Sequence, residues 1–94
     1  MTDMHTLTLP APLFMRAWEV VEAHARHGVE AGALTEDAAD AMLKAMEYRC
    51  EETSGRVLVR FTTEERDTYV AAFTVGAEAD DEWSDADFNA ALAV

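Results

Sequence analysis

The sequence has little cysteine and no long apolar run. Its single cysteine, Cys50, cannot form an internal disulfide, which favours a reducing compartment. No stretch approaches the roughly 18 apolar residues that a membrane-spanning helix needs. The first residues, MTDMHTLTL, lack the basic and apolar regions of a signal peptide. We therefore expect a cytoplasmic protein that does not associate with membranes.

Basic residues are also scarce. The chain has 7 Lys and Arg against 19 Asp and Glu, a formal net charge of -12. Proteins that bind DNA, RNA or anionic membranes need basic surface, so this balance argues against all three. If electrostatic attraction guides a partner to this chain, the partner is a protein with a basic patch.

The chain lacks the motifs of common catalytic sites. It has no Gly-rich phosphate loop, no nucleophile elbow and no metalloprotease helix motif. Glu51 and Glu52 are adjacent, which on a helix points them apart and makes them a poor general acid and base. Cys50 falls on the expected apolar stripe of a helix, where a buried, inert thiol is the default. We therefore expect neither catalysis nor a cofactor.

Metal ligands at suitable spacing are also few. His24 and His27 lie one helical turn apart, but Cys50 and His5 are elsewhere in the sequence. The run DDEWSDAD at 80–87 is acidic, yet it lacks the alternating ligands, central glycine and closing glutamate of a calcium loop. The sequence predicts no metal site.

Half of the 94 residues are hydrophobic, which predicts one packed domain over residues 1–94. Residues 56–75, rich in β-branched and aromatic side chains, are interpreted as a central β-hairpin. In such a hairpin, one face of the first arm carries Val57, Val59 and Phe61, and one face of the second carries Tyr69, Ala71, Phe73 and Val75. These two sets share a buried face only if the loop between them has an odd number of residues, which we prefer to a four-residue loop.

The other elements follow from periodicity. Residues 6–9 alternate and stop at Pro10, which predicts a short edge strand. Residues 12–27 or slightly beyond form a first helix, with Gly28 and Gly32 as candidate stops. Thr35 is the expected N-cap of a second helix that reaches Glu52 before Ser54 and Gly55. The short linker predicts that the two helices are antiparallel and cover one side of the sheet.

A short C-terminal helix is expected over 85–93. Ser84 is its N-cap, Asp87 is in the capping-box position, and Trp83 is placed to pack against Phe88. The predicted fold is therefore α+β, in the order β-α-α-β-β-α, with a small antiparallel sheet of about three strands.

The acidic residues gather in the second helix and near the C-terminus. Residues four apart on a helix rise about 6 Å along its axis, close to the scale of phosphate spacing along a nucleic-acid strand. We therefore expect a small binding protein that occupies the basic nucleic-acid site of a partner, as phage anti-restriction and anti-CRISPR inhibitors do. The candidate partner-binding residues are Glu36, Asp37, Asp40, Glu47, Glu51, Asp80, Asp81, Glu82, Asp85 and Asp87.

The alternative is an accessory or regulatory interaction domain that binds through an apolar sheet surface. Leu58, Val70 and Ala72 would lie on the second face of the predicted hairpin and could form such a surface. This reading is compatible with a homodimer.

Overall fold

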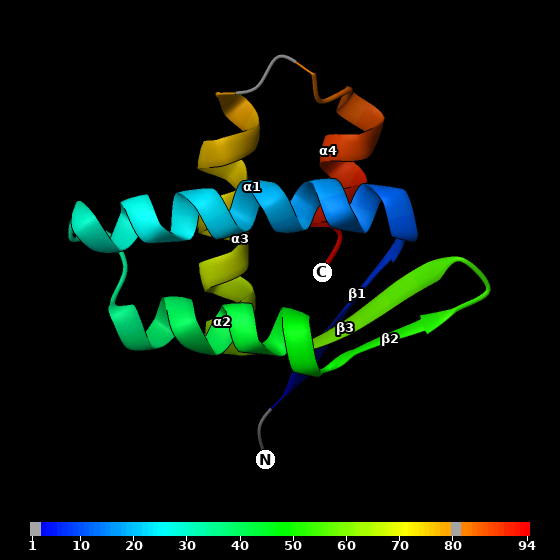
Figure 1. Ribbon diagram of the computed structural model, residues 1–94, viewed down its shortest axis with the longest axis horizontal. Coiled ribbons are helices and arrows are strands. Elements are labelled where there is room, and N and C mark those ends of the chain that lie inside the picture. The colour runs from blue at the N-terminus through cyan, green and yellow to red at the C-terminus, as the bar shows by residue number, and fades with distance from the viewer. Residues whose placement is uncertain (1–2, 80–81) are drawn as a thin grey trace.

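The computed structural model describes residues 3–79 and 82–94. Its elements are β1 (Met4–Pro10), α1 (Ala11–Glu30), α2 (Glu36–Tyr48), β2 (Cys50–Thr53), β3 (Arg56–Thr62), α3 (Thr63–Glu78) and α4 (Asp85–Leu92) (Figure 1). The α+β class, the three antiparallel strands of one open sheet and the order β-α-α-β-β-α are confirmed. Two helices, α3 and α4, follow the sheet where one was expected.

The sheet has the strand order β1-β3-β2, with both neighbours antiparallel to β3. Leu7 pairs with Val59 and Leu9 with Val57, so these side chains share one face and are buried. Phe61 completes this row. The expected edge strand over 6–9 is confirmed within β1, and the predicted alternation of 57, 59 and 61 is confirmed within β3.

The hairpin predicted over 56–75 is wrong in its second arm. The hairpin of the structure joins β2 to β3 through Ser54 and Gly55, which have φ angles of 54° and 78°. Positive φ at both central residues is the geometry of a two-residue turn whose twist matches that of the strands. The odd-numbered loop expected between the two arms therefore does not exist, since residues 63–67 form the start of α3.

A capping box starts α3. The Thr62 hydroxyl accepts a hydrogen bond from the Glu65 amide (3.3 Å), and the Glu65 carboxylate accepts one from the Thr62 amide (2.8 Å). Two of the four amides that lack an intrahelical partner at the helix start are thereby satisfied. Glu65 is buried and its second carboxylate oxygen pairs with Arg49. These interactions fix the start of the helix next to the end of β3.

The second helix is shorter than expected. Thr35 is its N-cap, as predicted, and accepts a hydrogen bond from the Ala38 amide (3.1 Å). The helix ends at Tyr48 rather than Glu52, because residues 50–53 pair with β3 as a strand. Cys50 is consequently on β2, opposite Val59, and not on a helical stripe.

The first helix is longer than expected and ends in a Schellman motif. Its cap is Ala31, followed by Gly32 with φ 78°. The Ala33 amide donates a hydrogen bond to the Gly28 carbonyl oxygen (2.8 Å), and the Gly32 amide donates one to the Val29 carbonyl oxygen (3.1 Å). Gly32 is therefore the stop, whereas Gly28 lies inside the helix.

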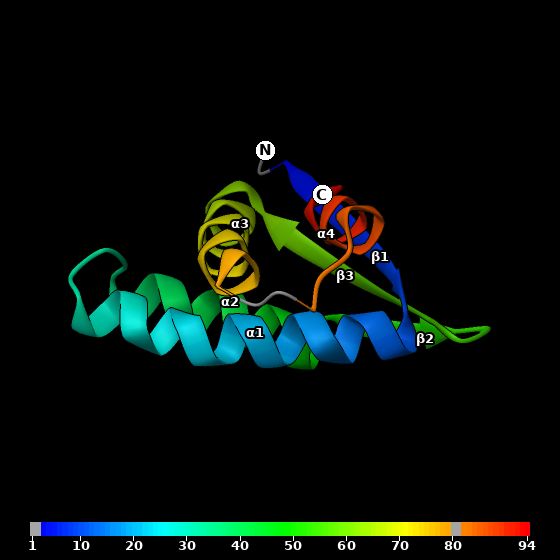
Figure 2. The same cartoon turned by 90° about the horizontal axis from the view of Figure 1, so that it is seen from above.

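The molecule has two layers. Figure 1 shows α1 and α2 side by side and antiparallel, as predicted. Figure 2 shows α3, α4 and β1 behind them, while the β2–β3 hairpin reaches forward to the level of the helix pair. One part of the helix pair packs on the sheet and another on α3. Buried side chains from both layers, including Met42, Val21, Phe61 and Phe73, form one core. The outer side of α1 and α2 is left to solvent.

The C-terminal helix begins as predicted. The Ser84 hydroxyl accepts a hydrogen bond from the Asp87 amide (3.2 Å). Trp83 and Phe88 both pack against Phe73, at ring-centroid distances of 4.9 and 5.6 Å. These contacts hold α4 against α3.

Candidate partner-binding site

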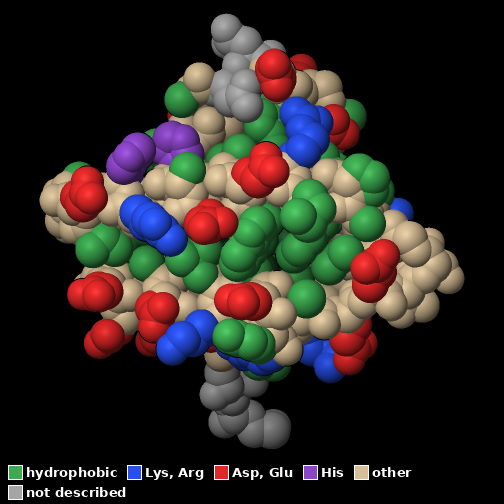
Figure 3. All heavy atoms as spheres, in the orientation of Figure 1, with side chains coloured by type: hydrophobic (Ala, Val, Ile, Leu, Met, Phe, Trp, Pro, Cys, Tyr) green, Lys and Arg blue, Asp and Glu red, His purple; other side chains and the backbone are tan. Residues whose placement is uncertain are grey.

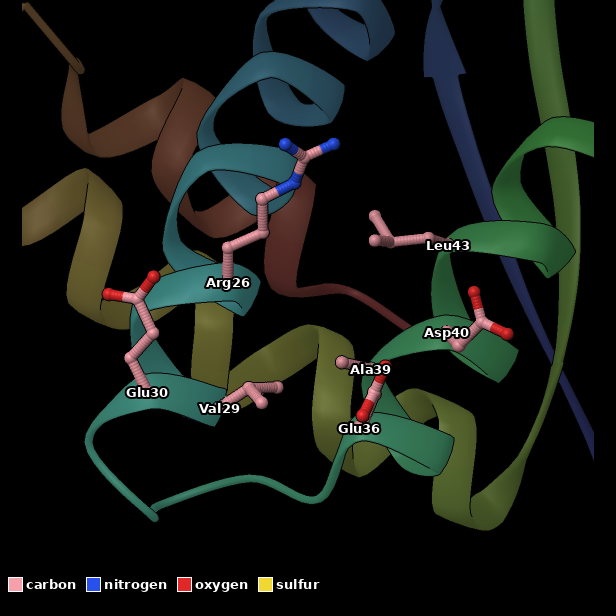
Figure 4. A pocket seen from close by; sticks show the side chains of 7 residues that line it. All are labelled: Arg26, Val29, Glu30, Glu36, Ala39, Asp40 and Leu43. Carbon is pink, nitrogen blue, oxygen red and sulfur yellow. The ribbon is translucent and has the colours of Figure 1, made fainter.

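A groove runs along the outer side of the helix pair. A cavity of about 370 Å³ lies between α1 and α2, and its apolar lining is Val29, Ala39 and Leu43. Figure 4 shows Val29 reaching toward α2 and Leu43 reaching toward α1. Arg26, Glu30, Glu36 and Asp40 complete its lining. The acidic residues of α2 thus border an apolar hollow, a feature that the sequence did not predict.

A second cavity of about 220 Å³ continues the first toward the C-terminus of α2. It shares Arg26, Asp40 and Leu43 with the first cavity and adds Trp18 and Tyr48. Glu22, Lys44 and Glu47 also line it. We call the two cavities together the α1–α2 groove. Figure 3 shows hydrophobic side chains at the centre of this face, with acidic side chains on both sides.

Both cations of the groove are paired with a carboxylate of their own helix. Arg26 lies 3.6 Å from Glu22, and Lys44 lies 3.1 Å from Asp40. The hydrogen bond and the charge of Asp40 raise the pKa of Lys44. Within residues 3–79 and 82–94, Glu30, Glu36 and Glu47 form no salt bridge. The groove therefore presents three uncompensated carboxylates around an apolar floor.

The structure separates the other candidate residues from this groove. Asp37 lines a different hollow, beside the N-terminus of α3, and Glu51 is exposed on β2. Asp85 is exposed at the start of α4. Asp80 and Asp81 lie outside the described residues. Among the described residues of the predicted set, only Glu36, Asp40 and Glu47 come together in the groove.

The acidic C-terminal segment is tied to α1 by Arg16. Its guanidinium lies 3.6 Å from the Asp87 carboxylate and 4.5 Å from the centre of the Trp83 ring, and it donates a hydrogen bond to the Glu82 carbonyl oxygen (3.2 Å). Helix α4 packs on α1 and β1, in the layer behind the helix pair (Figures 1 and 2). The acidic residues of α2 and those of 82–87 therefore do not form one patch.

The histidines and the cysteine that were considered as chemical sites make packing contacts and hydrogen bonds in the structure. The His24 and His27 rings meet edge to face, 5.7 Å apart, and line an apolar hollow of about 300 Å³ beside α3. His5 lies 3.0 Å from the Thr63 hydroxyl and 3.3 Å from Arg66. Cys50 is half-buried and its thiol donates to the Glu47 carbonyl oxygen (3.6 Å). Among the described residues, no three His, Cys, Asp or Glu side chains are grouped to hold a metal ion.

Sequence reasoning missed the α1 side of the groove. The available signal was the spacing of Glu22, Arg26 and Glu30, which places three charged residues in one line along α1. The periodicity of α1 does not show whether this line of charged residues faces α2 or points away from it.

Outside 1–2 and 80–81, no helix is long and apolar enough to cross a membrane. The fold and site define an α+β protein with an acidic, apolar-floored groove on its helical face. No family model, curated protein or solved structure matches the chain.

Proposed function

We propose that this chain is a small, non-catalytic binding protein that acts in the cytoplasm and occupies the basic, nucleic-acid-binding surface of a partner protein through its α1–α2 face. One observation supports the proposal above others: Glu30, Glu36 and Glu47 surround the groove without a cation partner among the described residues. Carboxylates held on a rigid surface attract a basic protein surface and repel nucleic acid.

The length of the acidic row on α2 supports competition with nucleic acid. Glu36 and Glu47 are eleven residues apart, which corresponds to about 16 Å along the axis of α2. Phosphates of one strand recur at about 3.4 Å of axial rise, so this row covers a length of roughly five phosphates. A partner that binds the row would lose access to nucleic acid over that length.

Leu58, Val70 and Ala72, the residues of the alternative apolar binding surface, do not share a sheet face in this fold. Val70 and Ala72 are on α3, not on a sheet face with Leu58, and Ala72 is buried. An interaction domain that binds through these three residues is therefore not proposed.

The test compares two charge reversals of equal size. Glu30 and Glu78 are both exposed and are the last residues of α1 and α3, where a lysine suits the helix dipole. Wild type, Glu30→Lys and Glu78→Lys are immobilised and incubated with nuclease-treated lysate of the cells that express the protein. Bound proteins are eluted with salt or with added double-stranded DNA or RNA.

We expect wild type and Glu78→Lys to retain the same nucleic-acid-binding protein, released by moderate salt and by added nucleic acid. Glu30→Lys should bind that protein about tenfold more weakly, equivalent to ~1.4 kcal/mol. Retention that is insensitive to nucleic acid, or equal loss in both variants, contradicts the proposal.

A further inference from the structure

The floor of the α1–α2 groove is more apolar than a purely electrostatic contact requires. Trp18 and Leu43 line it and are only partly buried, and Tyr48 has 73% of its surface exposed. Met15, three residues before Trp18 on the same side of α1, is 54% exposed. Apolar side chains in a line with charged residues on both sides are typical of a protein-binding surface.

From this arrangement we infer that the α1–α2 groove binds an amphipathic helix of the partner, with its apolar side chains on the groove floor and its Lys and Arg beside Glu30, Glu36 and Glu47. The inference rests on the proposed function and names the element of the partner that binds.

The shape of the groove suits a helix. Two antiparallel helices in one layer leave a furrow between them, and a third helix packs into such a furrow with its apolar residues at spacings of three and four. The groove extends from Glu36 to Tyr48, thirteen residues, or about 20 Å. This length matches a bound helix of three to four turns.

The charges of the groove restrict the occupant. A basic helix brings cations to both sides, because Glu30 belongs to α1 while Glu36 and Glu47 belong to α2. A second copy of this chain would bring the same carboxylates toward each other. Nucleic acid and anionic lipid would be repelled for the same reason. Charge complementarity therefore selects a basic helix over these three.

The probe is a fluorescently labelled 14-residue peptide of Leu and Lys, with Leu at helical spacings of three and four. Its control peptide has the same composition in an order that gives no apolar face. Dissociation constants are measured by fluorescence anisotropy at several salt concentrations. Sedimentation of the protein alone reports whether it self-associates.

Two pairs of variants distinguish the contribution of the apolar groove floor to peptide binding from that of the carboxylates. Tyr48→Ser removes an apolar group from the groove, and Val75→Ser removes one from α3 at a similarly exposed position, 61%. Glu30→Lys and Glu78→Lys form the charge pair. We expect the amphipathic peptide to bind wild type about tenfold more tightly than the control peptide. Tyr48→Ser and Glu30→Lys should each weaken binding about fivefold or more, and the two matched controls less than twofold.

Equal affinity for both peptides, or no effect of Tyr48→Ser, overturns the helix inference. If the nucleic-acid-sensitive capture by wild type persists in that case, the proposed function still stands; if that capture is absent as well, both fail. A dimer that Tyr48→Ser dissociates also overturns the inference, because the groove would then bind a second copy of the chain.

Discussion

The hydroxyl of Tyr69 on α3 donates a 2.8 Å hydrogen bond to the carbonyl oxygen of Ala91 on α4, and both residues are fully buried. Ala91 lies in the last turn of α4, where carbonyl oxygens have no partner within the helix. The Tyr69 ring stacks between Phe61 and Phe73, at 5.2 and 5.9 Å. One side chain thus joins the sheet, α3 and α4.

Tyr69→Phe tests this link. The substitution keeps the ring and removes the hydroxyl, which leaves the Ala91 carbonyl buried without its partner. We expect a loss of about 1–3 kcal/mol in the free energy of unfolding, measured by urea denaturation. Tyr48→Phe is the control, because Tyr48 is mostly exposed and its hydroxyl can bond water. Equal stability of the two variants would contradict the assignment.

Alkaline pH should weaken the same link. Burial raises the pKa of Tyr69 far above its usual value of 10.0. Below about pH 10 the hydroxyl is protonated in both the folded and the unfolded chain, so this group adds no pH dependence. Above that pH the unfolded chain releases the proton and the folded chain keeps it. Stability should therefore fall as pH rises from about 10 toward the folded pKa.

The measurement is urea denaturation at a series of pH values between about 9 and 11. Tyr69→Phe should lose less stability over this range than wild type does. Tyrosinate absorbance should show Tyr69 ionising only as the chain unfolds. A parallel loss of stability in wild type and variant would show that other groups dominate.

Local signals predicted the helix starts well. Thr35 and Ser84 each accept a hydrogen bond from the amide three residues later, as N-cap residues do. The same kind of signal was present in Thr62 and Glu65, which form a full capping box. The alternation of Tyr69, Ala71, Phe73 and Val75 indicated a strand instead, so this helix start was not predicted. In the structure Ala71 and Val75 are exposed, which is the outcome expected of a helix and not of a half-buried strand.

The buried positions of α3 also fit a helical period. Tyr69, Ala72, Phe73, Gly76 and Ala77 recur at spacings of three and four. Small residues at three of these positions weakened the hydrophobic signal, although they serve close packing. Composition and the alternation of side chains therefore favoured a strand, although the buried positions of the structure follow a helical period.

The candidate site was predicted in part. The acidic row of α2 follows from its sequence, because Glu36, Asp40 and Glu47 avoid the buried stripe. The apolar floor depends on how α1 and α2 pack, which no local pattern specifies. The distance between the two acidic segments likewise depends on α4 packing beside α1 and not beside α2.

Gly76 sets how closely α1 approaches α3. A methyl group at this position would overlap the Val20 side chain and come within 2.6 Å of His24 Cδ2, both on α1. Alanine is the better helix former by about 1 kcal/mol, yet the overlap should cost about 1–3 kcal/mol. We expect Gly76→Ala to lower the free energy of unfolding, measured by urea denaturation.

Gly28→Ala is the matched control, because Gly28 is also inside a helix and gains the same propensity. Its new methyl group would meet Leu34 Cδ1 at 2.8 Å, the end of a flexible side chain that can move aside. Gly76→Ala should therefore be less stable than Gly28→Ala, and the reverse order would contradict close α1–α3 packing. Because α1 rests on α3, its displacement in Gly76→Ala should also change the groove and weaken peptide binding there, whereas Tyr69→Phe should leave that binding intact.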